Sequence, residues 1–405
     1  MPELDVVVFG ATGFTGQLVA EYLIAHHAEL RIGLAGRSQS KLEQVRAALA
    51  VDDPDAAELP LIVADSFDAA SLSAMCRQTA VVCSTVGPYM TYGHALVEAC
   101  AASGTHYCDL TGEVTFTRAS IDNHSAAAAA SGARIVHSCG FDSVPSDMGT
   151  WMVQQAAIAR FGRPLDRVLY GLGRNKGGAS GGTVASMLTL MEQAATDRDV
   201  RRLLLDPYAL NPEGERSGPD GRDRMGLSWS DAFGGWVAPF LMAPVNTRVV
   251  RRTNAVLGYP YGRDFRYDEV VSCGPGPSGL KRAVTMTATY AGMGSAVLPP
   301  MRSLLRRVLP SPGEGPSKEQ REAGHFTVHL KGWGVDQHGA AVTLDGTVKG
   351  FRDPGYGETA KMLGEAATCL AVDDLESEGG VWTPASGLGD AYLDRLRGAG
   401  MVFDI

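Results

Sequence analysis

Three glycines spaced three residues apart lie near the start of the chain, in the stretch VVVFGATGFTGQLVAEYL of residues 6–23. A glycine-rich turn between a strand and a helix lets the backbone approach a pyrophosphate, and the free N–H groups of the helix attract that anion. The alternative is that the glycines only make a tight turn. Because the turn follows the first strand pattern and opens a helical pattern, we interpret it as a dinucleotide-binding turn. Its candidate contacts are Gly10, Thr12, Gly13, Phe14, Thr15 and Gly16.

The spacing GxxGxxG, with Thr12 inside the turn, is a variant common among reductases that prefer the phosphorylated cofactor. The stretch LAGRSQSKL at the end of the second strand pattern bears on that preference. An NAD site carries an acid there for the ribose 2′-hydroxyl, whereas a 2′-phosphate needs a cation and small donors. Arg37, Ser38 and Lys41 stand there without an acid, so the sequence predicts NADPH. The alternative is that Arg37 is only a solvated charge.

Two more strand ends complete the predicted cofactor site. Asp65, after the third strand pattern, is placed to flank the adenine. The stretch STVGPY ends the fourth strand pattern in a rigid turn, where we expect the nicotinamide. The cofactor contacts predicted in this turn are Ser84, Val86, Gly87 and Pro88. Tyr89 is a candidate catalytic residue facing the substrate, and an ordinary packed tyrosine is the alternative.

A second glycine-rich stretch, GRNKGGASGGTVASM, follows a strand pattern over 168–173. Its cations Arg174 and Lys176 make a candidate anion site in the half of the chain that should hold the substrate. Lys176 is our second candidate catalytic residue, and a flexible loop with solvated cations is the alternative. Tyr107, His137 and water are the other candidate proton donors, and periodicity does not choose among them.

Asp142 and Asp147 lie before and within the start of an apolar helical pattern. We interpret both as acids that stabilise a helix N-terminus rather than as catalytic residues. The chain carries no HExxH, no nucleophile elbow, no ATP-binding GxxxxGKS and no tyrosine-lysine pair of the YxxxK type after the fourth strand.

The elements that must position these residues alternate between short strands and helices in the first third of the chain. Strands are predicted over residues 5–9, 31–35, 61–64, 81–85, 106–110 and 134–138. Helices are predicted over residues 17–26, 41–49, 69–77, 94–103 and 116–131. This alternation predicts an α/β fold in which a doubly wound parallel sheet of Rossmann type binds the cofactor at the carboxyl ends of its strands.

We divide the chain into three parts. Residues 1–140 form the predicted NADP-binding Rossmann domain, and residues 141–353 form an α+β substrate and dimerisation domain. Residues 354–405 form a C-terminal segment that packs back on the first domain. Within the second part, HFTVHLKGWG and AAVTLDGTVKG alternate in the manner of a half-buried antiparallel pair.

The stretch from Phe233 to Val245 is apolar and aromatic, and three arginines follow it closely: Arg248, Arg251 and Arg252. Two prolines and its short length exclude a membrane-spanning helix. Three interpretations stay open: a buried core or dimer contact, a pocket for an acyl chain, and a peripheral contact with a membrane.

Composition narrows the class of protein. The formal net charge of −9 over 405 residues argues against a general nucleic-acid surface. Seven cysteines without a CxxC pair or metal-ligand spacing indicate reduced thiols and no metal site, which is typical of a cytoplasmic protein. The chain contains no stretch of about eighteen uninterrupted apolar residues, so no helix is expected to span a bilayer.

Several longer motifs carry a resemblance to a known family. These are GATGFTG, AGRSQSKL, STVGPYMTYG, YCDLTGE, ARIVHSCGFDSVPSDMG, KGGASGGTVASM and DPGYGETAKML. With them the chain resembles the saccharopine dehydrogenase-like oxidoreductases, and within that family it is most similar to the mycobacterial trans-acting enoyl reductases. The resemblance implies NADPH-dependent reduction of a carbon–carbon double bond in an acyl or polyketide chain held as a thioester. It also implies a polyketide synthase as partner, in lipid biosynthesis.

Two classes of function therefore stay open. The first is an NADPH-dependent oxidoreductase acting on enoyl groups, with a saccharopine-reductase-like imine or ketone reductase as its variant. The second is a non-catalytic NADP-binding scaffold or sensor. A complete 2′-phosphate site favours the enzyme, and we expect a homodimer rather than a monomer.

Overall fold

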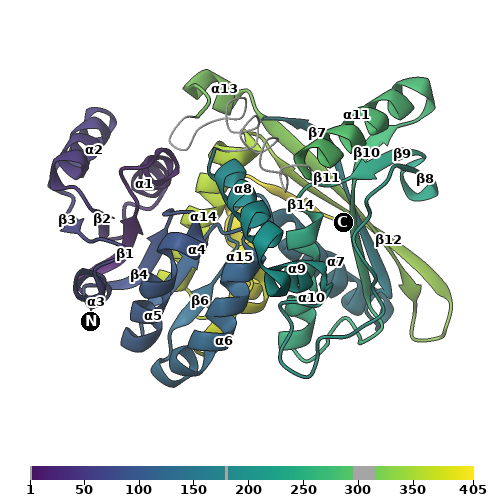
Figure 1. Cartoon of the computed structure of the whole chain (residues 1–405), viewed down its shortest axis with the longest axis horizontal. Coiled ribbons are helices and arrows are strands. Elements are labelled where there is room, and N and C mark those ends of the chain that lie inside the picture. The colour runs from purple at the N-terminus through teal and green to yellow at the C-terminus, as the bar shows by residue number, and fades with distance from the viewer. Residues whose placement is uncertain (1, 178–180, 295–314) are drawn as a thin grey trace.

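The computed structural model describes residues 2–177, 181–294 and 315–405, and it contains two seven-stranded sheets (Figure 1). All strand pairs in the first sheet are parallel, in the order β13-β6-β5-β4-β1-β2-β3. Its strands are β1 (Leu4–Phe9), β2 (Ile32–Gly36), β3 (Leu61–Val63), β4 (Thr79–Ser84), β5 (His106–Asp109), β6 (Arg134–Val136) and β13 (Gly380–Trp382). The first six strands lie within one or two residues of the predicted ranges, and the predicted fold class is confirmed.

Helices cover both faces of this sheet because its strands are apolar on both sides. Val6 and Val8 of β1 belong to one hydrophobic core and Val7 belongs to another. The helices between the strands are α1 (Phe14–His26), α2 (Gln39–Asp52), α3 (Ala69–Cys76), α4 (Tyr89–Tyr92), α5 (His94–Ser103) and α6 (Val114–Ser131), with a 3₁₀ turn over Pro54–Glu58.

The second sheet has the order β14-β12-β11-β7-β10-β9-β8, and only its β7–β10 pair is parallel. Its strands are β7 (Arg167–Lys176), β8 (Ser228–Ser230), β9 (Gly235–Pro239), β10 (Arg266–Gly274), β11 (His325–Val335), β12 (Ala341–Gly350) and β14 (Val402–Asp404). The predicted antiparallel pair is confirmed as β11 and β12. The other helices of this part are α7 (Val144–Phe161), α8 (Gly181–Thr196), α9 (Arg198–Leu205), α10 (Ala243–Val256), α11 (Gly276–Gly294), α13 (Lys318–Glu322) and a 3₁₀ turn, Asp231–Phe233. Of these, α7, α10 and α11 pack on the second sheet, whereas α9 packs on α6 of the first domain.

The C-terminal segment joins both halves of the molecule. A π-helical turn (Pro354–Glu358) leads into α14 (Thr359–Val372), which packs on α1, β4 and β5 of the first domain. Strand β13 then extends the first sheet beside β6, and α15 (Pro384–Gly398) packs on α14 and α7. The last strand, β14, pairs with β12 of the second sheet rather than returning to the first domain. The domain boundaries at 140 and 353 stay a prediction.

The apolar stretch from Phe233 to Val245 is partly buried, with its buried residues concentrated in β9. Val237 and Ala238 of β9 are buried, and the ring of Phe240 stacks on Tyr170 of β7 with centroids 5.6 Å apart. Phe233 packs so closely on Gly171 that a Cβ there would lie 2.3 Å from its ring. The buried members of the stretch agree with the interpretation as part of the core, and the acyl-chain pocket and the membrane contact stay predictions.

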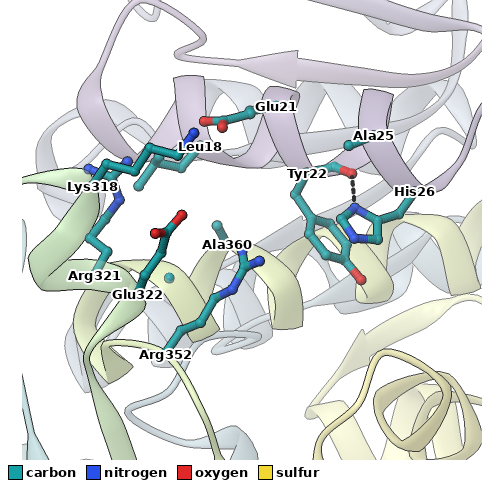
Figure 2. Close-up of a pocket in the computed structure, with 11 residues that line it drawn as sticks. Leu18, Glu21, Tyr22, Ala25, His26, Lys318, Arg321, Glu322, Arg352 and Ala360 are labelled. Carbon is teal, nitrogen blue, oxygen red and sulfur yellow. Dashed lines mark hydrogen bonds between the residues drawn. The ribbon is translucent and has the colours of Figure 1, made fainter. Parts of the chain in front are cut away.

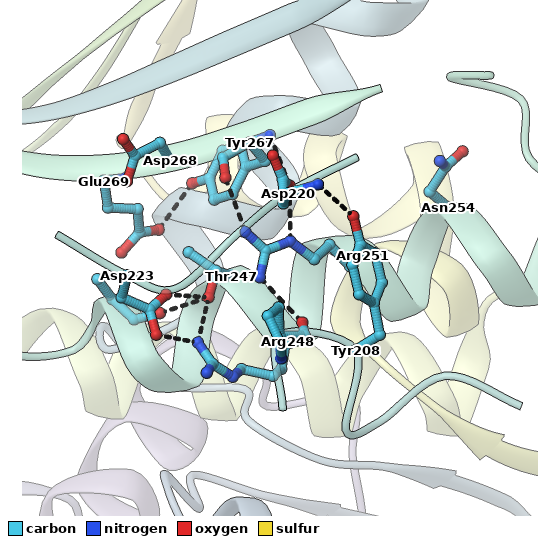
Figure 3. Close-up of polar contacts among 12 residues, drawn as sticks. Tyr208, Asp220, Asp223, Thr247, Arg248, Arg251, Asn254, Tyr267, Asp268 and Glu269 are labelled. Carbon is cyan, nitrogen blue, oxygen red and sulfur yellow. Dashed lines mark hydrogen bonds and ion pairs between the residues drawn. The ribbon is translucent and has the colours of Figure 1, made fainter. Parts of the chain in front are cut away.

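The three arginines of α10 are buried as well, contrary to a membrane-facing cluster. Figure 3 shows two of them, Arg248 and Arg251, with their acidic partners. Arg248 pairs with Asp223, and the Arg251 Nε atom lies 2.8 Å from Asp220 Oδ2. Both acids come from the polar stretch NPEGERSGPDGRDRM, whose composition is typical of an exposed loop. Arg252 donates to two backbone carbonyls at 2.6 Å, and burial lowers its pKa to about 9. The cations hold this loop against α10 and cannot reach anionic lipids.

Candidate cofactor and active site

The glycine turn between β1 and α1 has a shape that only glycine can adopt at two of its positions. Gly10 has φ +92°, and a Cβ there would lie 2.7 Å from the side chains of Thr85 and Val86. A Cβ on Gly16 would lie 2.1 Å from the carbonyl oxygen of Gly10. The first and third glycines therefore allow the turn, the start of α1 and the end of β4 to approach one another.

Among the residues that the structure describes, no side chain caps the N-terminus of α1. Gly13 is the N-cap, so no side chain caps the helix, and the first turn contains no acid. The neighbouring helices α2 and α3 are capped by Ser38 and Asp68. An anionic group at α1 would take the free donors of the turn that contains Phe14 and Thr15. These residues therefore fit the pyrophosphate of a dinucleotide.

The residues predicted to bind the 2′-phosphate lie beside this turn. A Cβ on Gly36, the last residue of β2, would lie 3.6 Å from Thr12. Arg37 and Lys41 follow it, are exposed, and form no ion pair with any residue that the structure describes. Ser38 accepts the N–H of Lys41 at 3.5 Å and so begins α2. Two unpaired cations and a hydroxyl fit a phosphate dianion.

The remaining five predicted cofactor contacts lie at the ends of β3 and β4. Asp65 is partly buried, and its Oδ1 atom accepts the N–H of Phe67 at 2.9 Å, which shapes the loop after β3. Ser84 is buried, and its hydroxyl has no hydrogen-bond partner among the described residues. Gly87 is exposed, whereas Val86 and Pro88 are partly buried. Val86 contacts the position of Gly10, which brings the turn after β4 against the glycine turn.

Tyr89 does not occupy the position expected of a catalytic residue. Its side chain is 4% exposed, and its hydroxyl donates to the carbonyl oxygen of Ser84 at 3.0 Å. The ring packs on Phe116 with centroids 5.6 Å apart, and burial raises its pKa well above the usual value. Tyr89 therefore supports the turn from the inside, in agreement with the alternative of a packed tyrosine.

Two of the other candidate proton donors are also committed to structural contacts. The Tyr107 hydroxyl donates to Asp109 Oδ2 at 2.9 Å, and the His137 Nδ1 atom lies 2.8 Å from the same oxygen. The second ring nitrogen of His137 lies 2.8 Å from the hydroxyl of Ser120, and all four side chains are buried. Neither Tyr107 nor His137 is placed to reach a substrate.

Lys176 is the candidate that reaches the surface. It ends β7 and lines a cavity of about 360 Å³ together with Gly177, Pro316, Glu319, Gln320, Ala323 and Asp353. Gly177 touches the segment of the π-helical turn, because a Cβ there would lie 2.2 Å from Asp353 Oδ1. Tyr356 of the same turn meets the ring of Phe14 edge-on at 4.9 Å. Asp353 of the cavity wall is the N-cap of the turn whose Tyr356 contacts Phe14, so this turn links the cavity to the start of α1. Residues 178–180, which follow Gly177 in the sequence, lie outside the described residues.

A second cavity, of about 210 Å³, lies along the middle of α1 rather than at its N-terminus. Figure 2 shows charged side chains around it: Glu21, Lys318, Arg321, Glu322 and Arg352. The carboxyl ends of the parallel strands do not contribute to it, so we do not assign it to the cofactor.

Asp147 does not cap its own helix. It is buried, and its carboxylate accepts the Thr253 hydroxyl at 2.5 Å and the N–H of Ala385 at 2.8 Å. It therefore joins α7 to α10 and caps the start of α15, and burial raises its pKa to about 6. Asp142 is partly buried just before α7.

Glu113 is a residue that the sequence analysis missed. It directly precedes α6, it is buried, and its carboxylate accepts the N–H groups of Tyr89 and Met90 and the hydroxyl of Ser186. One feature of the sequence could have identified it. Glu113 ends the motif YCDLTGE, which follows the fifth strand pattern, and the neighbouring fourth strand leads to the turn expected to hold the nicotinamide.

The described parts of the chain contain no disulfide, no candidate metal site and no candidate membrane span. All seven cysteines are free and buried. Among residues 2–177, 181–294 and 315–405, no group of three or more His, Cys, Asp or Glu side chains could hold a metal ion. No helix in those ranges has the length and hydropathy required to cross a membrane.

Comparison with known proteins agrees with this geometry. The family model of the saccharopine dehydrogenase NADP-binding domain matches residues 6–136. A Mycobacterium tuberculosis protein with the provisional name of a trans-acting enoyl reductase is 43% identical, over 98% of this chain and 96% of the relative. A trans-acting enoyl reductase of Mycobacterium bovis is 40% identical, over 99% of this chain and 97% of its own.

The saccharopine dehydrogenase (L-Glu forming) of Saccharomyces cerevisiae is similar in fold. Its structure superposes with a TM-score of 0.52 at 14% identity, over 98% of each chain. At this identity the likeness concerns the fold alone. The two close relatives span this chain almost completely, and the first domain is of the NADP-binding type. The chain therefore belongs to the family of trans-acting enoyl reductases, oxidoreductases built on the saccharopine dehydrogenase fold.

Proposed function

We propose that this protein is an NADPH-dependent enoyl reductase that reduces the carbon–carbon double bond of a thioester-bound acyl or polyketide chain. The observation that carries the proposal is the complete cradle at the carboxyl ends of β1, β2 and β4. It combines the glycine turn, the uncapped α1 and the unpaired cation Arg37. A bound NADPH would supply the hydride.

The chain's own residues have two tasks in this reaction. The first is to hold the dinucleotide, with Gly10, Gly13 and Gly16 at the pyrophosphate, Arg37 at the 2′-phosphate and the turn 84–88 at the nicotinamide. The second is to stabilise the negative charge that develops on the thioester oxygen. We assign the second task to Lys176, because it is the exposed cation of the cavity that the π-helical turn links to the start of α1.

A polyketide synthase that lacks its own enoyl reductase is the partner we propose, which places the protein in lipid biosynthesis. The support is the name of the relatives, which describes an enoyl reductase that acts in trans. We do not extend the proposal to a membrane surface, because the arginines behind the apolar stretch are buried.

A homodimer is part of the same proposal. One face of β11 and β12 packs on α7, and the other carries partly exposed side chains that include Lys331 and Trp333. Such a half-exposed antiparallel face suits a contact between two copies. Light scattering of the purified protein gives the mass, and a monomer at micromolar concentration contradicts the dimer.

The reductase proposal is tested by following NADPH absorbance with purified protein and a panel of 2-enoyl thioesters of increasing chain length. Saccharopine-type imines and simple ketones serve as the comparison substrates. Oxidation of NADPH with the enoyl thioesters alone supports the proposal. Oxidation with imines or ketones but not with enoyl thioesters overturns it.

A further inference from the structure

The carboxylate of Glu113 is buried at the carboxyl end of β5 and receives three hydrogen bonds. The N–H of Tyr89 donates to its Oε1 atom at 2.9 Å, and the N–H of Met90 donates to Oε2 at 2.8 Å. The hydroxyl of Ser186 also donates to Oε1, at 2.6 Å. Both oxygens are used, and the residue is only 3% exposed.

Two of these donors belong to the first residues of α4, which directly follows the turn 84–88. The cap residue of α4 is Pro88, and no side chain at that position caps the helix. Glu113 therefore supplies from a distance the acceptors that a capping residue would provide. Because Gly87 and Pro88 immediately precede these N–H groups, the position of the turn depends on the carboxylate.

The third donor belongs to the other half of the molecule. Ser186 lies on α8, which follows the Lys176 strand, whereas Glu113 and the turn belong to the first sheet. A single buried oxygen, Oε1, thus receives one hydrogen bond from the turn beside the expected nicotinamide and one from the substrate half. Hydrogen bonds to a carboxylate are stronger than neutral ones, so this junction has a defined geometry.

We propose that Glu113 is a positioning residue. Its carboxylate holds the turn 84–88 in the position required beside the nicotinamide, and its hydrogen bond with Ser186 makes that position depend on α8. This inference rests on the proposed function, because it takes the turn to be the nicotinamide site. Hydride transfer is sensitive to displacements of about 1 Å, so a small shift of the turn should slow the reaction more than it weakens cofactor binding.

The test uses two variants and one matched control. Glu113→Gln places an NH₂ group where one carboxylate oxygen accepts a donor, and Ser186→Ala removes only the link to α8. Glu365→Gln is the control, because Glu365 is also a buried carboxylate with two hydrogen-bond donors, Tyr22 and His27, which lie at the C-terminal end of α1 and not in the turn. Each protein is measured for NADPH affinity, for the emission of bound reduced nicotinamide and for kcat with an enoyl thioester.

We expect Glu113→Gln to lower kcat by at least about tenfold and to change the NADPH Kd by less than about threefold. The emission of the bound nicotinamide should change as well, and Ser186→Ala should shift both readouts in the same direction by less. The control should lower the melting temperature without moving either readout. If Glu113→Gln does not fold, Ser186→Ala carries the test, because it leaves the carboxylate in place.

The proposal is overturned if Glu113→Gln, or Ser186→Ala in its place, lowers only the melting temperature and leaves kcat and nicotinamide emission at the wild-type values. The measurement of nicotinamide emission does not require the protein to turn over a substrate. If the wild-type protein binds NADPH but reduces no enoyl thioester, the proposed function fails, and the emission of the variants still decides the role of Glu113.

Discussion

Replacing Arg37 with alanine should change which cofactor the protein prefers. Arg37 is exposed at the end of β2 and forms no ion pair with any residue that the structure describes. Its loss should therefore leave no buried partner unsatisfied and should not disturb the fold. The only interaction removed is the one expected with the 2′-phosphate, which NADPH carries and NADH lacks.

The magnitude follows from the kind of contact that is lost. A hydrogen bond to a charged group contributes about 1.5 to 3 kcal/mol, which corresponds to a loss of about 10- to 140-fold in NADPH affinity. NADH affinity should change by less than about twofold. Lys41 stays in place in this variant and keeps part of the attraction, so we expect the lower half of that range.

The assay is calorimetric titration of the wild-type protein and the Arg37→Ala variant with both cofactors. Arg31→Ala is the matched control, because Arg31 lies at the opposite end of the same strand, where it pairs with Asp5. That exposed pair contributes little, so the control should bind NADPH normally. An equal loss of NADPH and NADH affinity in Arg37→Ala refutes the assignment of Arg37 to the 2′-phosphate.

Three further predictions concern the buried groups and the glycine turn. Burial raises the pKa of Glu269 from 4.5 to about 8, so its ionisation destabilises the fold as the pH rises through that interval. Glu269 also accepts hydrogen bonds from Asn246 and Tyr267, so only the pH dependence of the change isolates its ionisation. Between pH 5 and pH 8, the free energy of unfolding of Glu269→Gln in urea should rise relative to the wild type by on the order of 3 kcal/mol, and an equal change at both pH values contradicts this. The hydrogen bond that His27 donates to Glu365 raises the pKa of His27 above its usual 6.5, so this bond contributes stability below pH 6.5, and the contribution is lost as the pH rises through the folded-state value. His27→Gln should thus lower the melting temperature more at pH 5.5 than at pH 9, and the reverse order would rule this linkage out. Gly16→Ala puts a methyl group 2.1 Å from a backbone oxygen and should weaken NADPH binding by more than about tenfold in calorimetry. The control Gly398→Ala, with no atom within 4 Å, should bind as the wild type does, and normal binding by Gly16→Ala would disprove the close approach.

The first sheet and its glycine turn could be predicted from the sequence because their signals are local. A short apolar run, a glycine triplet directly after it and a cation after the second such run each show within a few residues. The positions of Gly10, Gly16 and Arg37 at the carboxyl ends of β1 and β2 follow from that local pattern and from the parallel order of the strands.

The remaining features depend on partners far away in the chain. Whether Arg248 is solvated or buried depends on Asp223, which lies 25 residues earlier in a stretch with loop composition. Whether Tyr89 faces the substrate depends on Phe116, and the role of Glu113 depends on Ser186, 73 residues later. Local composition carries no information about these pairings, so a tyrosine beside the nicotinamide turn was a reasonable but unsupported catalytic candidate.

Strand β13 illustrates the same limit at the level of topology. Residues 380–382 are too short to stand out as a strand, yet they pair with β6 and extend the first sheet. Parallel strands are joined by long connections, and here nearly the whole substrate domain separates β6 from β13. An alternating pattern over only three residues does not predict that the chain returns to the first sheet.

The most direct test of the central claim is to follow the hydride itself. The purified protein is incubated with NADPH deuterated at the transferred position of C4 and with a 2-enoyl thioester, and the product is analysed by mass spectrometry. An enoyl reductase should deliver one deuterium to the β-carbon of a saturated thioester. Deuterium on a former carbonyl or imine carbon in the comparison reactions, with none in the thioester, would contradict the account.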